Sequence, residues 1–277
     1  MTSRESDVAR DTYRHLRMML IALPVLLLVA AALSALVLGT VEGSLSAYYL
    51  GPIRDVLVGT MVGTAVCLVA YRGAPLEDYA LNLAGFFAVF VAFVPTGLGA
   101  TLAGLAPEAR AELVGSLRVT IVAVLVVAAV FVYAEWRTGR FSPTALSRPP
   151  TTRWLFRVNT ALAVGFLGLV GWRLVEGDAF GGVHLAAAVL LIVGLVTAVA
   201  SHGWPEMVGE QGAGPRGRYR AIALLMIAGL PLLLVLRALD VPYAVILTEC
   251  WEIALFAAFW IMETVRTWRP RVERQTS

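Results

Sequence analysis

The sequence predicts an all-α protein, a polytopic bundle of membrane-spanning helices, and three observations support this. Hydrophobic residues occupy 59% of the 277 positions and charged residues only 15%, whereas a typical soluble domain carries roughly 25% charged residues. The mean hydropathy is +0.78. The apolar residues come in long blocks, and about 20 consecutive apolar residues cross a hydrocarbon core of roughly 30 Å. We therefore expect one integral membrane domain over residues 1–277.

Eight apolar blocks can be separated, and each predicts one span. They cover about residues 18–40, 54–71, 79–96, 117–135, 154–173, 182–201, 219–237 and 243–265. The last two are separated only by residues 237–242, where Asp240 and Pro242 favour a turn over one long helix. A connection at 137–153, rich in Pro, Ser and Thr, divides the chain into two halves of four spans.

The basic residues indicate how the spans are oriented. All 22 are arginines, and 17 of them fall in the two terminal tails and in connections that eight spans place on the same side. The other five are Arg54, Arg110, Arg118, Arg173 and Arg237. The positive-inside rule then predicts that both termini are cytoplasmic, in the inner membrane of a cell. Arginines that set topology also explain the formal charge of +3, so we expect no nucleic-acid partner.

The connection between the first two predicted spans, residues 41–59, is dense in polar side chains. It contains Ser46, Tyr48, Tyr49, Arg54 and Asp55. Asp55 is expected in the first turn of the next helix, where a carboxylate interacts favourably with the helix dipole. Two interpretations are open: an interfacial loop with a tyrosine belt and a capped helix, or a polar pocket at the outer membrane surface.

The last predicted span contains three glutamates, Glu249, Glu252 and Glu263, on one helical stripe. Glu263 is expected near the cytoplasmic interface, where Arg266 and water can satisfy it. Glu249 and Glu252 are expected about 9 and 13 Å deep, where an uncompensated charge costs several kcal/mol. These two side chains should therefore face the bundle interior and have partners.

We expect Arg54 or Arg118 to pair with Glu249, with Tyr48, Tyr49 or Asn82 supplying hydrogen bonds. Such a set has two interpretations. It is either a buried network that fixes how the helices pack, or a site that binds a ligand or handles protons.

Catalytic and metal-binding patterns are not found. A zinc-dependent membrane hydrolase needs three converging ligands, but His15 lies in the N-terminal tail, and His184 and His202 lie about 27 Å apart at the two ends of the sixth span. The sequence contains no Walker A loop, no GxSxG and no CxxC. We expect no metal, no cofactor and no catalytic residue, and an enzyme is the less favoured class.

Two motifs carry a family resemblance. A Ser-x-Ser-x-Tyr-Tyr loop precedes an Arg-Asp helix start, and the last helix contains a glutamate followed by a phenylalanine. The matching residues are Ser44, Ser46, Tyr48, Tyr49, Arg54, Asp55, Glu252 and Phe259. In these motifs the chain resembles an uncharacterised group of bacterial multi-pass membrane proteins that is distantly similar to the DRAM/Frag/Sfk group of eukaryotic membrane proteins. The resemblance covers roughly residues 44–96 and 249–262; this chain departs from it by a loose middle at 98–118 and an extra Glu249.

Several members of the eukaryotic group act in lipid or lipid-anchor handling, so the resemblance implies a lipid as a partner. The leading hypothesis is a non-enzymatic protein that binds a lipid or small molecule in an outer-leaflet polar pocket. The residues expected to line it are Ser46, Tyr48, Tyr49, Arg54, Asp55, Asn82, Glu249 and Glu252. One alternative is a proton-coupled transporter in which Glu249 and Glu252 titrate, and another is a structural membrane scaffold.

Overall fold

The computed structural model describes residues 3–39, 41–138, 149–176, 180–209 and 214–268, and these residues form helices joined by short connections. The elements in chain order are α1 (Ser3–Leu38), the 3₁₀ helix η1 (Leu45–Leu50), α2 (Arg54–Ala70), α3 (Pro75–Phe93), α4 (Leu98–Ala103), α5 (Pro107–Arg137), α6 (Pro150–Glu176), α7 (Val183–Gly203), α8 (Pro205–Val208), α9 (Arg216–Ile227), α10 (Gly229–Ala238) and α11 (Ala244–Trp268). The described residues contain no strand, which confirms the all-α class.

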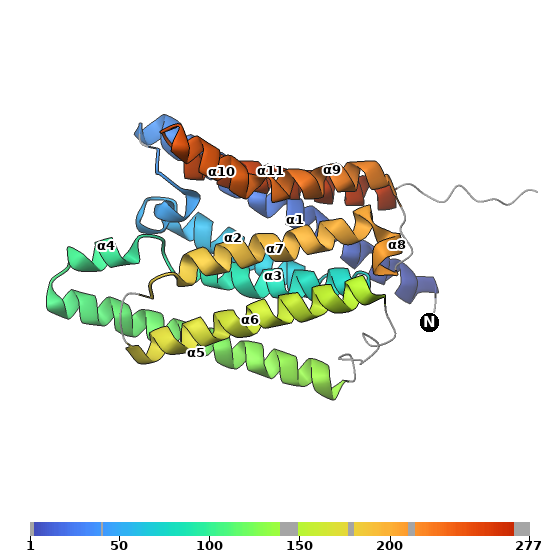
Figure 1. Cartoon of the computed structure of the whole chain (residues 1–277), viewed down its shortest axis with the longest axis horizontal. Helices are drawn as coiled ribbons and strands as arrows, with labels where there is room; N and C mark the ends of the chain where they lie inside the picture. The colour runs from blue at the N-terminus through green and yellow to red at the C-terminus, as the bar shows by residue number, and fades with distance from the viewer. Residues whose placement is uncertain (1–2, 40, 139–148, 177–179, 210–213, 269–277) are drawn as a thin grey trace, which may run out of the picture.

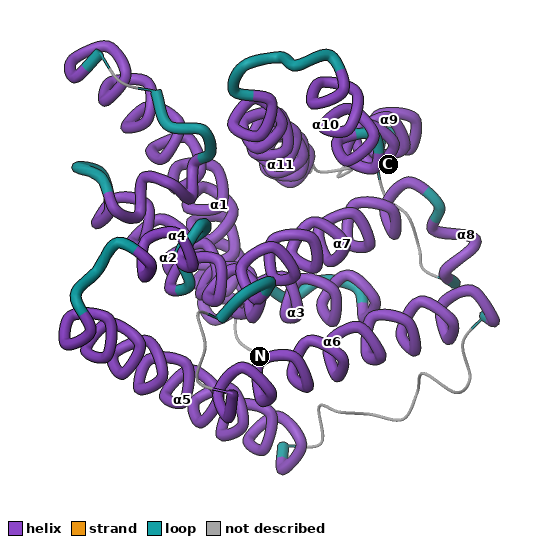
Figure 2. Tube along the Cα trace, turned by 60° about the vertical axis from the view of Figure 1, so that its left-hand side comes forward, coloured by secondary structure: helices purple, strands orange, loops and turns teal. Residues whose placement is uncertain are grey.

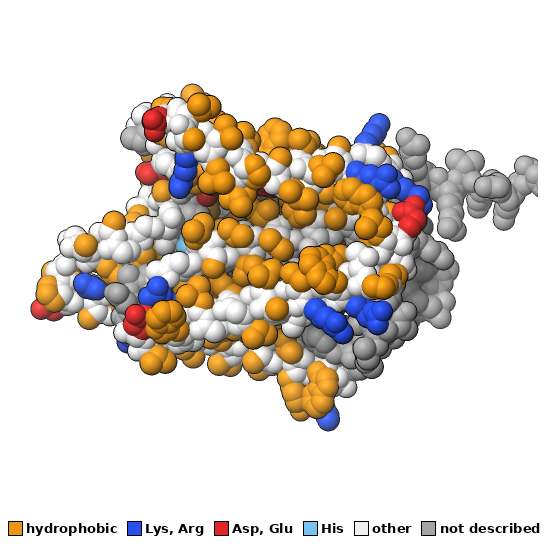
Figure 3. All heavy atoms as spheres, in the orientation of Figure 1, with side chains coloured by type: hydrophobic (Ala, Val, Ile, Leu, Met, Phe, Trp, Pro, Cys, Tyr) orange, Lys and Arg blue, Asp and Glu red, His pale blue; other side chains and the backbone are white. Residues whose placement is uncertain are grey.

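The protein has the build of a multi-pass membrane protein. Seven segments are long and apolar enough to cross a membrane: α1, α3 with α4, α5, α6, α7, α9 with α10, and α11. Figure 3 shows apolar side chains along the bundle, with charged side chains mostly toward its two ends. The remaining predicted span is α2, whose 17 residues reach about 25 Å. It packs between α1 and α3, and its crossing of the membrane stays a prediction.

Successive long helices run in opposite directions between the two ends of the bundle (Figure 1). At one end Arg72, which follows α2, donates to Glu135 near the end of α5 at 3.0 Å. This end also contains Arg17, and we call it the arginine-rich end. At the opposite end Nδ1 of His184 lies 2.6 Å from the carbonyl oxygen of Val94. Residues 139–148 of the predicted linker and the arginines beyond 268 lie outside the described residues.

Helices α3 and α7 form the centre of the bundle, and glycines let their backbones approach closely. A Cβ added to Gly194 of α7 would lie 2.9 Å from the carbonyl oxygen of Ala80 in α3. Similarly, a Cβ on Gly85 of α3 would lie 2.8 Å from the carbonyl oxygen of Ala65 in α2. Small residues allow such close contacts between membrane helices. Figure 2 shows α9, α10 and α11 grouped on one side of this centre, and α5 and α6 on the other.

The structure differs from the predicted spans in two places. Helix α5 begins at Pro107, about ten residues before the predicted start, and the stretch expected to be loose forms α4 and the first turns of α5. Pro107 fits there because the first turn of a helix does not use the N–H that proline lacks. The predicted span 219–237 is interrupted only at the single residue Ala228, whose backbone angles stay right-handed helical (φ −71°, ψ −13°); Pro231 in the next turn has no N–H to donate to the carbonyl oxygen of Ile227.

The predicted turn between the last two spans is confirmed. The chain reverses between Ala238 and Ala244. Asp240 and Tyr243 take positive φ angles of 50° and 62°. Such angles are incompatible with a continuing α-helix. Helices α10 and α11 therefore pack as an antiparallel pair (Figure 1).

Candidate functional site

The loop after α1 and the last helix are in contact, so the two polar regions of the sequence meet. The backbone N–H of Leu45 donates to Oε2 of Glu249 at 2.6 Å. Leu45, Tyr48 and Tyr49 share a buried apolar cluster with Ile246 of α11. The loop thus covers the start of α11, at the end of the bundle away from the arginine-rich end.

The expected partner of Glu249 was wrong. Glu249 accepts a hydrogen bond from the first N–H of η1, a group that has no acceptor within its own helix, and not from an arginine. Arg54 donates instead to the hydroxyl of Tyr49 at 3.3 Å and lies 4.7 Å from the centre of its ring. The Nε of Arg118 is buried without a hydrogen-bond partner among the described residues. Arg54 and Asp55 are exposed at the start of α2.

The remaining polar residues predicted to line the pocket do not gather around one point. Ser46 is buried inside η1, and Tyr48 is 1% exposed. The hydroxyl of Ser44 accepts from the N–H of Ala47 at 3.1 Å and so caps η1. Asn82 lies on α3, where its Oδ1 is buried without a hydrogen-bond partner in the described part of the chain. The loop side chains therefore mainly serve the packing and capping of the loop.

Glu252 faces a different part of the protein, the interruption between α9 and α10. Its side chain is 7% exposed, and its Oε2 has no hydrogen-bond partner among the residues that the structure describes. A Cβ added to Gly229 would lie 1.9 Å from Oε1 of Glu252, so the carboxyl group lies against the glycine backbone. The neighbouring Trp251 donates to the carbonyl oxygen of Leu225 at 3.2 Å and holds α11 beside the last turn of α9.

A second polar cluster lies at the arginine-rich end. We call it the carboxylate network, and its members come from α3, α7, α9 and α11. They are Glu77, His202, Tyr219, Glu263 and Arg266. Figure 1 shows that the ends of these helices lie together.

Glu263 is the centre of the carboxylate network and is completely buried. Arg266 donates to it through Nε at 3.1 Å and through Nη2 at 2.6 Å, which makes a bidentate ion pair. The hydroxyl of Tyr219 donates to the same carboxylate. Nδ1 of His202 lies 3.9 Å from Oε1 of Glu263. This carboxylate is therefore well compensated in spite of its burial.

His202 also faces Glu77. Its Nε2 lies 2.9 Å from Oε1 of Glu77, within ion-pair distance, although the approach is too bent for a hydrogen bond. The other carboxylate oxygen of Glu77 accepts from the N–H of Ala74 at 3.2 Å, at the start of α3. Glu77 is 2% exposed. The imidazole ring therefore lies between two buried carboxylates from two different helices.

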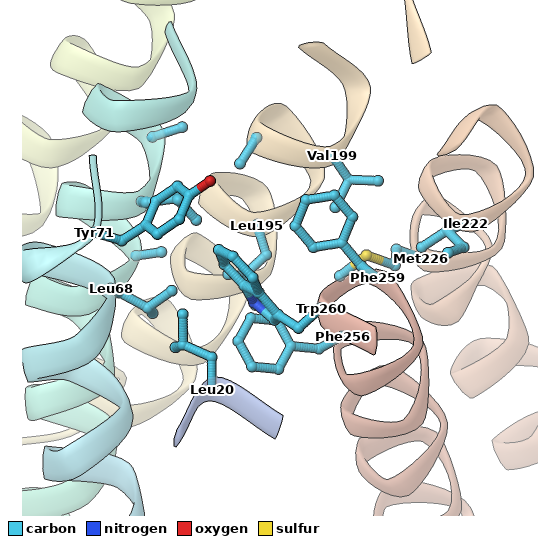
Figure 4. Close-up of a cluster of buried hydrophobic side chains, with 14 of the residues drawn as sticks. Leu20, Leu68, Tyr71, Leu195, Val199, Ile222, Met226, Phe256, Phe259 and Trp260 are labelled. Atoms are coloured by element: carbon cyan, nitrogen blue, oxygen red, sulfur yellow. The ribbon is translucent and has the colours of Figure 1, made fainter. Parts of the chain in front are cut away.

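An apolar layer adjoins the carboxylate network. Figure 4 shows the rings of Tyr71 and Trp260 directed toward each other, with Phe259 beside them. The centres of the Tyr71 and Trp260 rings are 4.9 Å apart. Arg17 of α1 donates to the Tyr71 hydroxyl at 3.2 Å. Burial, reinforced by the nearby Glu77 carboxylate, raises the pKa of Tyr71 to about 12.

The sequence predicts part of the carboxylate network. The pairing of Glu263 with Arg266 is confirmed, but Glu263 is enclosed by protein and not open to water as expected. Sequence reasoning did not identify Glu77, His202 or Tyr219 as members; of the three it considered only His202, as a possible metal ligand. Within the described residues no three His, Cys, Asp or Glu side chains are placed to hold a metal ion.

Comparison with known proteins gives no match, either to a family model, to a curated protein or to a solved structure. The two buried sites on α11, around Glu252 and around Glu263, are therefore the features that indicate a function.

Proposed function

We propose that this protein is a proton-coupled membrane transporter in which Glu252 carries the proton. The observation that supports this most is the burial of Glu252 without a compensating partner for Oε2. An ionisable side chain inside a membrane is costly and rare, and usually marks a transport or proton path. The other two glutamates of α11 have partners, so Glu252 is the exceptional one.

The surroundings of Glu252 support the proposal. Its carboxyl group lies against Gly229, where α9 and α10 are interrupted. Interrupted helices are a common feature of transporter binding sites, because their free backbone groups can bind ions or substrates. Here Pro231 leaves the carbonyl oxygen of Ile227 without its usual donor. The Glu252 carboxyl group thus lies beside a helical turn that lacks one of its usual backbone hydrogen bonds.

The proton cycle follows from the energetics of burial. Without a partner, Glu252 is less costly as the neutral acid than as a buried carboxylate. It would release the proton only when water reaches it, through movement of α10 against the rest of the bundle. Helix α10 packs mainly on α11 and α9, and it exposes Leu230, Leu234 and Val235. Movement of α10 would therefore disturb mainly its contacts with these two helices.

The test uses purified protein in proteoliposomes that contain a pH-sensitive dye. A small-molecule extract of cells is added outside under an imposed pH gradient, and dye response measures proton movement. We expect extract-dependent proton movement for the wild type and for Glu176→Gln, whose side chain is exposed at the end of α6. We expect its loss for Glu252→Gln. Equal proton movement in Glu252→Gln would refute the proposal.

Binding of a lipid or small molecule at the opposite end is the second candidate. The exposed Arg54, which stacks on Tyr49, together with the neighbouring Asp55, favours it, since an exposed guanidinium can bind an anionic headgroup. With this candidate we also propose that the protein belongs to the bacterial group named above. We further propose that it lies in the inner membrane with both termini in the cytoplasm. In a thermal unfolding assay, anionic lipid should stabilise the wild type and fail to stabilise Arg54→Gln. Equal stabilisation of both would contradict this candidate.

A further inference from the structure

We infer that His202 is a second proton-binding site, and that its proton holds the arginine-rich end of the bundle closed. The inference extends the proposed function, because Glu252 and Glu263, the centre of the carboxylate network, lie on the same helix, α11. It depends on its own contacts, however, and can fail while the proposal for Glu252 holds.

The charges of the carboxylate network provide a place for one proton. Glu77 and Glu263 carry two negative charges, and Arg266 carries one positive charge. With a neutral His202 the network has an excess of one negative charge, and with a protonated His202 it is balanced. Each ring nitrogen faces a carboxylate, at 2.9 Å and 3.9 Å, and the side chain is only 14% exposed. At such distances, shielded from water, opposite charges strongly favour the imidazolium.

Three neighbouring arginines at this end donate to other groups. Arg17 donates to Tyr71 and to Thr267. Arg220 donates to the carbonyl oxygen of Gly203 at 2.7 Å. Arg72 forms ion pairs with Asp78 and Glu135. The groups that bear on the ring are then, by helix, Glu77 of α3, Tyr219 of α9, and Glu263 and Arg266 of α11.

The proton joins two parts of the bundle. Glu77 and His202 belong to the central pair α3 and α7, whereas Tyr219 and Glu263 belong to the group α9 to α11. A protonated ring attracts the carboxylates of both parts. When the proton leaves, Glu263 keeps Arg266 as its partner but Glu77 loses its counter-charge, and the excess negative charge that remains between the two parts favours their separation. The arginine-rich end should then open.

Thermal unfolding of the full-length protein in nanodiscs of neutral lipid, between about pH 5 and pH 9, tests the proton site. A proton held more tightly in the folded state stabilises at low pH, and this stabilisation is lost as pH rises. We expect the unfolding temperature of the wild type to fall over this range, and that of His202→Gln to change much less. His184→Gln is the matched control, since His184 lies on the same helix and faces the Val94 carbonyl oxygen.

Glu77→Gln provides a second variant if His202→Gln does not fold. Its effect and that of His202→Gln should be coupled at the low-pH end and independent at the high-pH end, because only the imidazolium attracts the carboxylate. A wild-type pH slope in His202→Gln, or loss of the slope in His184→Gln, would overturn the proton site. Glu252 contributes its own share of the slope if it also holds a proton. In a Glu252→Gln background the further loss of slope caused by His202→Gln should therefore persist, which makes the failure of one proposal distinguishable from that of the other.

Opening is measured separately with a native thiol. Cys67 is buried in the apolar layer beside Tyr71, and Cys250 is the second cysteine of the chain. In a Cys250→Ala background at one fixed mildly acidic pH, a membrane-permeant maleimide should label Cys67 several-fold faster in His202→Gln than in His184→Gln. Equal labelling rates would show that the proton does not close this end.

Discussion

Glu263→Gln should destabilise the protein far more than the same change at Glu252, although both side chains are buried in the same helix. The substitution removes the charge to which Arg266 donates two hydrogen bonds and weakens the bond from Tyr219. Removal of one partner of a buried ion pair costs about 3–5 kcal/mol. The Arg266 side chain is 30% exposed and can recover part of this by hydration, so we expect the lower value, about 3 kcal/mol.

Thermal unfolding in detergent, followed by circular dichroism, measures this difference. A loss of about 3 kcal/mol corresponds to a fall of roughly 6–12 °C in unfolding temperature for a chain of this size. Oε2 of Glu252 has no hydrogen-bond partner among the described residues, so Glu252→Gln should stay within a few degrees of the wild type. Glu249→Gln retains an oxygen that can accept from Leu45 and should fall between the two. If Glu252→Gln lowered the unfolding temperature as much as Glu263→Gln or more, this would refute the assignment of a structural role to Glu263 and a functional role to Glu252.

Three further predictions concern packing and pH. Gly229→Ala should lower the unfolding temperature, because its Cβ would lie 1.9 Å from Oε1 of Glu252, and this loss should be relieved in Gly229→Ala/Glu252→Ala; an equal loss in both backgrounds would contradict the contact. Gly194→Leu should destabilise by about 1–3 kcal/mol in chemical unfolding, since its Cβ would meet the carbonyl oxygen of Ala80 at 2.9 Å, and an unchanged midpoint would argue against this packing. The pKa of Tyr71 is raised by burial to about 12, so its stabilising effect is complete below its ordinary value of 10.0 and is lost as pH rises toward 12; Tyr71→Phe should therefore lose less stability than the wild type over that range.

The membrane class and most of the spans are predictable from the sequence, because apolar block length directly reflects bilayer thickness. The turn near Asp240 is also predictable, since it depends on local residues. The interruption at Ala228 is less predictable. Pro24 and Pro231 both lie in apolar blocks, yet α1 is continuous through Pro24. Whether a proline interrupts a helix depends on neighbouring helices, which the sequence does not specify.

In the candidate sites too, features that depend on local sequence are predictable, and features that depend on packing between distant segments are not. The helical period correctly places Glu252 toward the interior, because it follows from geometry within one helix, whereas Glu263 was expected at a water-accessible interface and is completely buried. Their partners are not predictable, since Glu77, His202 and Gly229 lie far away in the chain and approach only through packing. The expectation that Glu249 would pair with an arginine failed for a related reason: a backbone N–H of η1 is available there, and sequence patterns do not reveal backbone donors.

The protonation state of Glu252 is the most direct test of the proposed function. Infrared spectroscopy of the protein in nanodiscs at neutral pH detects the C=O stretch of a protonated carboxylic acid, and the difference between the wild type and Glu252→Gln isolates this residue. We predict a protonated-acid band that is lost in Glu252→Gln and that Glu263→Gln retains. If the difference spectrum shows only an ionised carboxylate at Glu252, that residue holds no proton to transport, and the account is contradicted.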